Sequence, residues 1–470
     1  MKKIILISIL SYLICGITYG QNKKPKISGV VKISIEEGTI EAEVTLSDYS
    51  HINNYLIRLN SGLNIRNIES LEPDNFLLGF RREFADSLRT YETFSYYFPA
   101  AERGEKLLPS KLKFRYSGKF PVISDTISEN YQKKDWKGNI VFMNGLLRLD
   151  GLQSAWLPIL YDVDNDFQYD LIDYDLEIIC EDCEQIYMNA CEPKNGPKAH
   201  LKSNSPKEPF LFVGNYKVQK GKYVAALNAN FSETQLSEFD RANQKIIDFL
   251  SAYTNISYNE KIYWVQAYKS VKETGYFAFA SNPTFVLCGN PPSDLKSTFQ
   301  EQLDGDFLFT IAHELSHYYF GTLKPCNNTM ETLINEGFAE FLAMRFAISL
   351  GMEETIKTGL INISEYVNDE NFRFKPMDEI KNLSDTNDRE TYAYEYQVLV
   401  LACIEKEIGE DKMRKWIRLL LAGETPISNK EFFQSTLKNV IKDDEKFENI
   451  KNKYLVGSET IKSINEMINR

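Results

Sequence analysis

The 470-residue sequence lacks the features of several large protein classes. After residue 17, no stretch approaches the roughly 20 consecutive apolar residues that a transmembrane helix needs, so no membrane span is expected. Basic residues number 54 against 66 acidic ones, and the formal net charge of -12 argues against nucleic acid as a partner. Internal repeats and low-complexity tracts are also missing. With 43% hydrophobic residues, the chain is long enough for two or three domains with real cores.

The N-terminal segment has the pattern of a secretory signal. A charged start at residues 1–3 precedes an apolar run over residues 4–17, and small residues follow before Gln21. We therefore predict that residues 1–20 are a signal peptide. The mature protein would then be exported and be periplasmic, extracellular or surface-associated. Lipidation at Cys15 is the alternative, but the residues before this cysteine are not the small ones that a lipoprotein signal uses.

Of the seven cysteines, six remain if Cys15 is removed with the signal, an even number that suits an oxidising compartment. A CxxC pattern is present, but no second CxxC or nearby histidine completes a tetrahedral zinc site. We expect a local structural disulfide in the segment IICEDCEQIYMNACEP, with the pairing left open. The six cysteines are Cys180, Cys183, Cys191, Cys288, Cys326 and Cys403.

The pattern of the sequence divides the chain into three parts. Residues 21–200 contain short alternating runs, such as TIEAEVTLSD and DYDLEIICED, and predict an antiparallel β domain. Residues 194–209 are rich in Lys, Pro, Ser and Asn and are predicted to be a connector. Residues 205–350 are predicted to form an α+β lobe, in which one helix starts with a capping pattern at Ser232. Residues 351–470 are predicted to form a helical lobe.

The segment HELSH contains two of the four histidines. Asp306 is the predicted N-cap of a helix that passes through this segment and stops at Gly321. On such a helix His313 and His317 are four residues apart and share one face, so their rings can converge on one ion. Glu314 projects beside the same face. Two neutral nitrogen ligands and an adjacent carboxylate are what a hydrolytic zinc site needs.

A second helix is predicted from Asn328, where Glu331 completes a capping pattern, to Gly351. If the two helices are antiparallel, Glu336 meets the histidine face as a third ligand and leaves one zinc position for water. Glu340 lies one turn further on the same face. It could accept the second ring N–H of one of the histidines, as metal-bound histidines generally require.

The alternative is a pair of ordinary buried helices whose histidines have protein partners. With four histidines in the chain, roughly 0.005 chance matches to HExxH are expected, so we favour a site for one Zn2+ ion.

HELSH, the gap of 18 residues before Glu336 and the NEGFA block resemble the aminopeptidase N family of gluzincin metallopeptidases, which includes leukotriene A4 hydrolase-like enzymes. The segment TYAYEYQVLVLACIEKEIGEDKMRKWI resembles the family's tyrosine segment and the helix after it. LKFRYSGKF and LQSAWLPILYD resemble weaker signatures of its β domain. The resemblance implies a multidomain α+β fold, with an N-terminal saddle-like antiparallel β domain, a thermolysin-like zinc catalytic domain and a helical C-terminal lobe.

The resemblance also implies roles for individual residues. His313, His317 and Glu336 would bind the zinc ion, and Glu314 would be the general base. Tyr394 would donate a hydrogen bond to the oxyanion of the tetrahedral intermediate.

Two neighbouring tyrosines, Tyr392 and Tyr396, are alternatives for this last role.

One departure from the family concerns the substrate's amino group. Family aminopeptidases hold the free amine with the glutamate of a Gly-x-Met-Glu-Asn segment. The counterpart here is residues 278–282, in which Asn282 is kept and Ser281 replaces the glutamate. A neutral hydroxyl cannot pair with an ammonium group as a carboxylate does, so selectivity for free N-termini is in doubt.

The sequence therefore predicts an exported zinc metallopeptidase that acts on peptides or proteins, with exopeptidase or endopeptidase action left open. Two alternatives remain. One is a zinc-binding or peptide-binding homologue without catalysis, and the other is a non-peptidase hydrolase, such as an epoxide or ester hydrolase, on the same site.

Overall fold

The computed structural model describes residues 24–72, 76–84, 93–124, 140–270, 275–301, 305–326, 330, 332–367, 375–380, 391–423, 428–456 and 460–468. The predicted signal peptide, Asn328 and Glu331 lie outside these residues. Within them, no helix combines the length and the apolar character needed to cross a bilayer.

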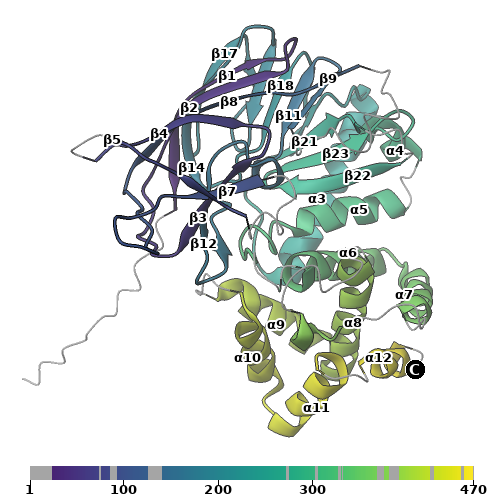
Figure 1. The fold of residues 1–470 in the computed structure, drawn as a ribbon. Helices are drawn as coiled ribbons and strands as arrows, with labels where there is room; N and C mark the ends of the chain where they lie inside the picture. Colours follow the sequence, from purple (N-terminus) through teal and green to yellow (C-terminus); the bar gives the residue numbers. More distant parts are fainter. Residues whose placement is uncertain are drawn as a thin grey trace, which may run out of the picture.

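The N-terminal part is built from three β-sheets (Figure 1). Its strands are β1 (Lys26–Ser34), β2 (Thr39–Ser47), β3 (Tyr55–Asn60), β4 (Asn64–Ser70), β5 (Phe76–Leu77), β6 (Arg81–Glu83), β7 (Thr93–Tyr97), β8 (Leu112–Lys119), β9 (Val122–Ile123), β10 (Ile140–Met143), β11 (Leu146–Leu149), β12 (Ile159–Asp162), β13 (Phe167–Gln168), β14 (Asp173–Cys180), β15 (Gln185–Met188), β16 (Lys194–Asn195), β17 (Lys198–Lys202) and β18 (Leu211–Gly214). A short helix, α2 (Gly151–Ser154), follows β11.

The strand orders are β17-β14-β1-β2-β8-β4-β5, β16-β15-β18-β11-β10-β9 and β13-β12-β3-β7-β6. Most neighbours are antiparallel, as predicted, and the exceptions are the parallel pairs β1–β14 and β9–β10. β2 shows why these segments form strands, since every second side chain from Ile40 to Leu46 is buried and those between them point outward. The buried faces of the strands pack into one apolar core.

The prediction that residues 194–209 form a connector is wrong. They contain β16 and β17, and the next strand, β18, still belongs to the six-stranded sheet. In β17 Ala199 and Leu201 point inward while the polar residues between them face solvent. β17 is an edge strand, and the lysines that protect such an edge conceal the alternation in the sequence. The β part therefore extends to Gly214.

A mixed five-stranded sheet follows. Its strands are β19 (Val218–Lys220), β20 (Val224–Leu227), β21 (Ile262–Ala267), β22 (Tyr276–Ser281) and β23 (Thr284–Gly289), in the order β19-β20-β21-β23-β22. The central strands β20, β21 and β23 are parallel, and β22 is an antiparallel edge strand. Helix α3 (Glu233–Thr254) crosses over between β20 and β21, and its capping box at Ser232 is present as predicted.

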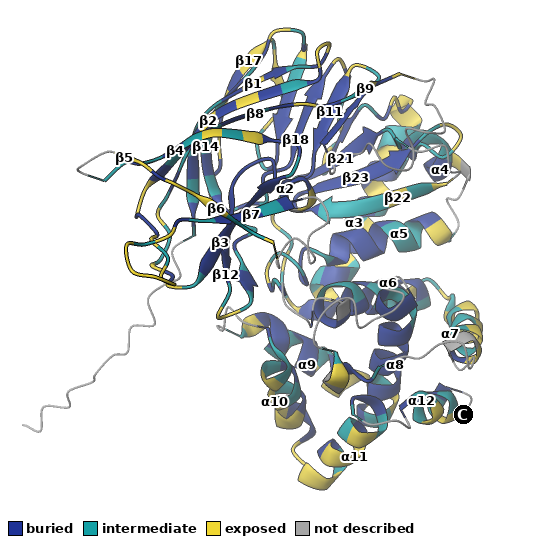
Figure 2. Cartoon of the chain, viewed as in Figure 1, coloured by how far each residue is buried: buried dark blue, intermediate teal, exposed yellow. Residues whose placement is uncertain are grey.

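Both faces of this sheet are covered (Figures 1 and 2). On one face Trp264 and Phe285 pack in the core that the helices share. On the other face Tyr263 and Val265 pack against Phe212 of the six-stranded sheet. The central strands are consequently buried throughout, as expected for parallel strands covered on two sides.

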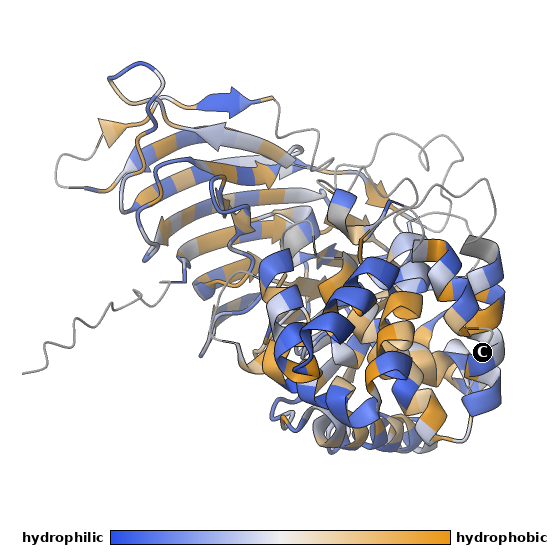
Figure 3. Cartoon of the chain, turned by 90° about the horizontal axis from the view of Figure 1, so that it is seen from below, coloured by the Kyte–Doolittle hydropathy of each residue, from blue (hydrophilic) through white to orange (hydrophobic). Residues whose placement is uncertain are grey.

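The rest of the chain is helical. Its segments are α4 (Leu295–Glu301), α5 (Asp306–Ser316), the π-helical segment η2 (Thr332–Gly337), α6 (Phe338–Ser349), α7 (Glu353–Val367), the 3-10 turn η3 (Met377–Glu379), the π-helical segment η5 (Thr391–Tyr396), α8 (Gln397–Ile408), α9 (Glu410–Ala422), α10 (Lys430–Ile441), α11 (Asp444–Tyr454) and α12 (Thr460–Ile468). α8 is buried along most of its length (Figure 2). Seen from below, the helices of this part show hydrophilic and hydrophobic residues side by side (Figure 3). The predicted multidomain α+β fold, with an N-terminal β domain and a helical C-terminal lobe, is confirmed.

Two predicted helix boundaries need correction. The helix with HELSH has Gly305 as its N-cap and ends at Ser316 rather than at Gly321. Beyond Ser316 the backbone N–H groups of His317, Tyr318 and Tyr319 bond to carbonyls three residues back, so the chain tightens before it turns at Gly321. The second helix opens with η2 instead of an α-helical turn.

The expected local disulfide joins Cys180 to Cys183 at the turn between β14 and β15. Cys191 is a free thiol, as are the three other described cysteines.

Stacked aromatic rings link the two segments that carry the HELSH and NEGFA motifs. The rings of Phe320 and Phe338 lie 4.5 Å apart and are inclined by only 13°, and both are fully buried. We expect Phe338→Ala to lower the free energy of unfolding by about 3–5 kcal/mol, because it leaves a cavity beside α5.

Denaturant unfolding followed by circular dichroism measures this loss. Leu323→Ala is the control. Leu323 lies in the turn that follows Phe320, and it is 42% exposed. This control substitution should change the free energy of unfolding by less than about 0.5 kcal/mol. Equal effects of the two substitutions would contradict the role of the stacked pair.

Candidate metal centre

Helix α5 and its C-cap residue His317 bring the two histidines of HELSH to one point, as predicted. His313 and His317 are one helical turn apart, and their Nε2 atoms lie 3.2 Å from each other. Both side chains are mostly buried, with exposed fractions of 9% and 15%. Glu336 on η2 completes the group, with its Oε2 3.5 Å from each Nε2. The three predicted ligands are therefore brought together.

The other nitrogen of each ring has its own acceptor. Nδ1 of His313 lies 2.7 Å from Oε2 of Glu340, and Nδ1 of His317 lies 3.1 Å from the carbonyl oxygen of Phe320. Both acceptors lack hydrogens, so each Nδ1 carries the donated proton. In the neutral rings both Nε2 lone pairs then face each other and the Glu336 carboxylate.

This arrangement fits a metal cation. Three electron-pair donors converge with no proton between them, which is unfavourable unless a positive charge lies there. A tetrahedral zinc ion with bonds of about 2.0–2.2 Å separates its ligand atoms by roughly 3.3–3.5 Å. The distances between the three donor atoms are 3.2, 3.5 and 3.5 Å. His313, His317 and Glu336 thus match the size and chemistry of a zinc site.

The electrostatics of the site also favour positive charge. Burial lowers the pKa of His313, but hydrogen bonds to Glu336 and Glu340 outweigh it and raise the pKa well above the ordinary value. The pKa of Glu336 is lowered well below its usual range, because the nearby histidines outweigh the opposing effect of burial. The carboxylates of Glu336 and Glu340 thus make positive charge favourable at this point, in agreement with the donor geometry.

The π-helical segment η2 sets the direction of Glu336. A π-helical turn contains one more residue than an α-helical turn and often occurs at functional sites. The neighbouring side chain of Asn335 donates from Nδ2 to the carbonyl oxygen of Cys326 at 2.7 Å, which ties η2 to the chain that follows α5. Glu340 lies one turn later on α6, where it reaches His313.

Glu314 lies beside the metal ligands and is only 5% exposed. Its Oε2 is buried and has no hydrogen-bond partner among the described residues. Burial raises the pKa of its carboxyl group, although His313 and His317 oppose the shift. A buried carboxylate oxygen with no hydrogen-bond partner can accept a proton from a molecule that enters the site.

The three tyrosines of the YAYEY segment have different surroundings. Tyr394, on η5, places its ring edge-on to His313 with the ring centres 5.7 Å apart, and it is half-buried. Tyr392 and Tyr396 pack against each other at 5.2 Å and are only 1% exposed. Burial raises the pKa values of both, that of Tyr396 to about 12. The ring of Tyr394 is thus in contact with a predicted metal ligand.

Ser281 and Asn282 occur at the end of the edge strand β22, where both side chains are at least 95% buried. Asn189 donates from Nδ2 to the backbone oxygens of both residues, and Tyr258 donates to Oδ1 of Asn282 at 3.2 Å. The Ser281 Oγ lies 3.4 Å from Nδ2 of Asn189, so the side chain is turned toward the β part of the molecule. Its hydroxyl leaves this position neutral, as the sequence indicated.

Asn189 and Tyr258 were missed by the sequence analysis, because no motif identifies either residue.

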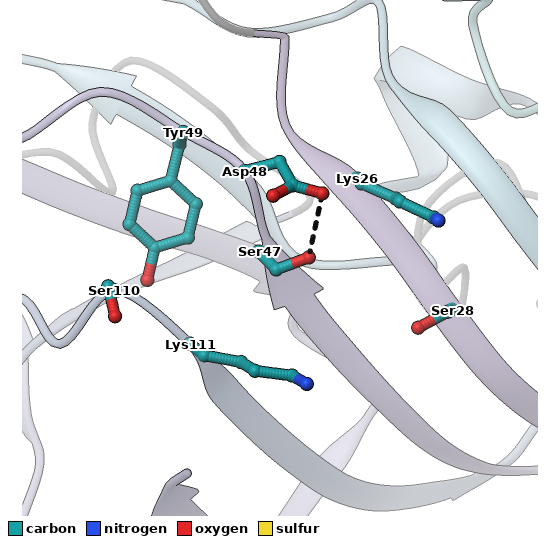
Figure 4. Close-up of a pocket in the computed structure, with 7 residues that line it drawn as sticks. All are labelled: Lys26, Ser28, Ser47, Asp48, Tyr49, Ser110 and Lys111. Carbon is teal, nitrogen blue, oxygen red and sulfur yellow. Dashed lines mark hydrogen bonds between the residues drawn. The ribbon is translucent and has the colours of Figure 1, made fainter. Parts of the chain in front are cut away.

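Two other features do not compete with this site. Cys180, Asp182 and Cys183 lie close together, but the disulfide between the two sulfurs removes the thiolates that a metal would need. A cavity of about 450 Å³ lies at one end of the seven-stranded sheet (Figure 4). It is lined by charges of both signs, and it shares no residue with the metal centre. Its lining residues are Lys26, Ser28, Ser47, Asp48, Tyr49, Ser110 and Lys111.

Known structures share the fold of this chain. Native yeast LTA4 hydrolase is 15% identical with a TM-score of 0.62, and the similarity covers 94% of this chain and 68% of the yeast protein. A variant of the M1 zinc metallopeptidase from Deinococcus radiodurans, bound to the substrate Tyr-Ser-Ala, is 13% identical with a TM-score of 0.60. In that case 92% of this chain and 94% of the other are covered.

A comparison with curated protein sequences finds no match. Residues 238–454, which include all the predicted metal ligands, match the sequence model of the Peptidase family M1 domain. The part of the chain that carries the metal ligands is therefore similar to the Peptidase family M1 domain, in agreement with the gluzincin family that the HELSH and NEGFA segments resemble.

Proposed function

We propose that this protein is an exported zinc metallopeptidase that hydrolyses peptide bonds, with Glu314 as the general base. The observation that carries the proposal is the convergence of two histidine nitrogens and one carboxylate oxygen beside an unpartnered oxygen of Glu314. The match of residues 238–454 to a peptidase-family domain supports peptides or proteins as substrates. Export rests on the signal pattern in residues 1–20.

His313, His317 and Glu336 would hold the zinc ion. When bound in such a site, zinc acts as a Lewis acid and makes a water molecule acidic enough to lose a proton near neutral pH. Glu340 and the carbonyl of Phe320 keep both imidazoles in the tautomer that presents Nε2 to the ion.

Glu314 moves the proton. Its Oε2 accepts a proton from the attacking water and then delivers it to the nitrogen of the leaving amine, as general acid–base catalysis requires. Burial makes this carboxylate more basic than an exposed glutamate, which improves it as a base.

Tyr394 stabilises the charge that develops on the substrate. Its phenol belongs to the half-buried side chain that contacts His313, so it can donate to an oxyanion formed beside the histidine. Tyr392 and Tyr396 are too deeply buried for this role.

The position held by a glutamate in family aminopeptidases is occupied by the neutral Ser281, whose side chain is buried. We therefore propose that the enzyme does not depend on a free N-terminus and also cleaves internal or blocked peptides. We also propose that Asn282 binds substrate. Its buried Nδ2 has no acceptor among the described residues, so it can donate to a bound peptide.

Glu314→Gln tests the catalytic proposal. The amide keeps the shape of the side chain but cannot take a proton, so kcat should fall by about 10²- to 10⁴-fold. Cleavage of a mixed peptide library, followed by mass spectrometry, gives the rates and the product ends. Zinc content should stay at that of the wild type. Glu354→Gln, on the exposed side of α7, is the matched control and should leave kcat unchanged. Equal activity of wild type and Glu314→Gln would refute the assigned role.

Glu340→Gln tests the support of His313. The variant keeps a hydrogen-bond acceptor but loses the negative charge, so zinc affinity should fall about 10- to 100-fold. Competition with a fluorescent chelator measures the affinity without any substrate. Glu354→Gln again serves as the control, and an affinity loss shared by both variants would point to a nonspecific charge effect.

A peptide and its N-acetylated twin test the substrate class. Because Ser281 cannot pair with an ammonium group, acetylation should change kcat/KM by less than about tenfold. Cleavage confined to the free peptide would show that another group holds the amine and would reject this part of the proposal.

A further inference from the structure

The edge strand β22 is held against the metal-binding helix at its first residue. The ring of Tyr276 meets the ring of Phe307 edge-on, with the centres 5.8 Å apart. Its hydroxyl lies 3.3 Å from Oγ1 of Thr310, which is on α5 three residues before His313. Figure 2 shows β22 as a half-buried strand beside the buried β23. The start of β22 is therefore fixed relative to the metal centre.

The other end of β22 is held by the β part of the molecule, through Asn189. This residue directly follows β15 and has no exposed surface. Its Nδ2 donates to the carbonyl oxygen of Ser281 at 2.6 Å and to that of Asn282 at 3.0 Å. A third contact, to the carbonyl oxygen of Glu208, is 3.1 Å long. One side chain thus binds the two residues at which β22 ends.

The orientation of Asn189 is fixed independently of β22. Its backbone N–H donates to Phe210, and its carbonyl accepts from the hydroxyl of Tyr174. Its side-chain Oδ1 accepts from Oγ1 of Thr284 at 2.6 Å, and the hydroxyl of Tyr187 lies 2.5 Å from the same Oγ1. Because Oδ1 has this donor, the amide can present only its N–H groups to the end of β22.

A chain of contacts runs from this end of β22 to the second metal ligand. Tyr258 donates to Oδ1 of Asn282 at 3.2 Å, and its ring packs on the ring of Tyr318 with the centres 4.4 Å apart. Tyr318 directly follows His317. The end of β22 is thereby linked both to the β part and to the end of α5.

We propose that Asn189 is a positioning residue for substrate binding, and that it acts by holding the end of β22. An edge strand has unpaired backbone groups on one side, and an extended peptide can bind them as an added strand. If the end of β22 is no longer held, the strand offers its backbone groups less well, and a peptide binds more weakly in the ground state and in the transition state alike. The kinetic part of this inference rests on the proposed peptidase function, whereas its structural part does not.

Asn189→Asp is the test variant, because it replaces the two N–H donors with an acceptor of nearly the same shape. Loss of these hydrogen bonds should weaken ground-state and transition-state binding alike. We expect KM to rise about tenfold while kcat stays within about twofold and bound zinc is unchanged. A merely structural role would lower the active fraction, so kcat would fall and KM would not change.

Asn243→Asp is the matched control. Asn243 on α3 is equally buried, and its Nδ2 donates to the carbonyl oxygen of Phe239 at 2.8 Å, away from β22. This variant should lose stability without a rise in KM.

If Asn189→Asp does not fold, Thr284→Val replaces Asn189→Asp as the test variant, because this change removes only the hydroxyl that orients the amide. A smaller rise in KM is then expected.

Hydrogen exchange read by mass spectrometry tests the structural part without any substrate. Peptides that cover residues 276–283 should exchange faster in Asn189→Asp and Thr284→Val than in wild type, and at the wild-type rate in Asn243→Asp. Equal exchange in all variants, or a fall in kcat without a rise in KM, would overturn the inference. If the wild type cleaves no peptide, the proposed function fails, and the exchange rates alone decide whether Asn189 holds β22.

Discussion

The metal centre depends on two hydrogen bonds made by the histidine nitrogens that face away from it. The carboxylate of Glu340 and the backbone carbonyl of Phe320 each accept from one Nδ1. These bonds fix the tautomers and the ring planes, and so turn both Nε2 lone pairs toward Glu336. One acceptor is a side chain on α6 and the other is a backbone atom at the turn after α5. The packing of α5 against α6 therefore determines the chemistry of the centre.

The N-terminal β sheets contribute to this geometry from the opposite side. The six-stranded sheet covers one face of the mixed sheet, and Asn189 binds the end of β22, the edge strand of the mixed sheet. The helices cover the other face and carry the metal ligands. The edge strand is thus held between two layers, and its position relative to the metal centre depends on both of them.

The sequence predicted the parts of the site that depend on short spacing. The separation of His313 from His317 requires only a helix, and the capping box at Ser232 requires only local hydrogen bonds. The π-helical segments η2 and η5 could not be predicted in this way. Each segment's hydrogen bonding reflects tertiary packing, and no residue type signals the extra residue in the turn.

The structure also separated alternatives that the sequence left open. The five-residue segment YAYEY contains three tyrosines. Only the packing of the rings shows that Tyr394 meets His313. The prediction of a connector at residues 194–209 was wrong for a related reason. The lysines of β17 face solvent from an edge strand, so the composition of this segment resembled that of a loop.

The two-sided burial of the mixed sheet affects how the chain can be divided. The segment that matches the family domain begins at residue 238, inside α3, whereas β19 and β20 of the same sheet come before it. The layer that covers the other face, including Phe212, comes earlier still. A fragment cut at residue 238 would lose two strands and expose the apolar side chains of β21 and β23 to water. The boundary of the family domain therefore cuts through one sheet, and the layer that buries the other face of that sheet carries none of the metal ligands.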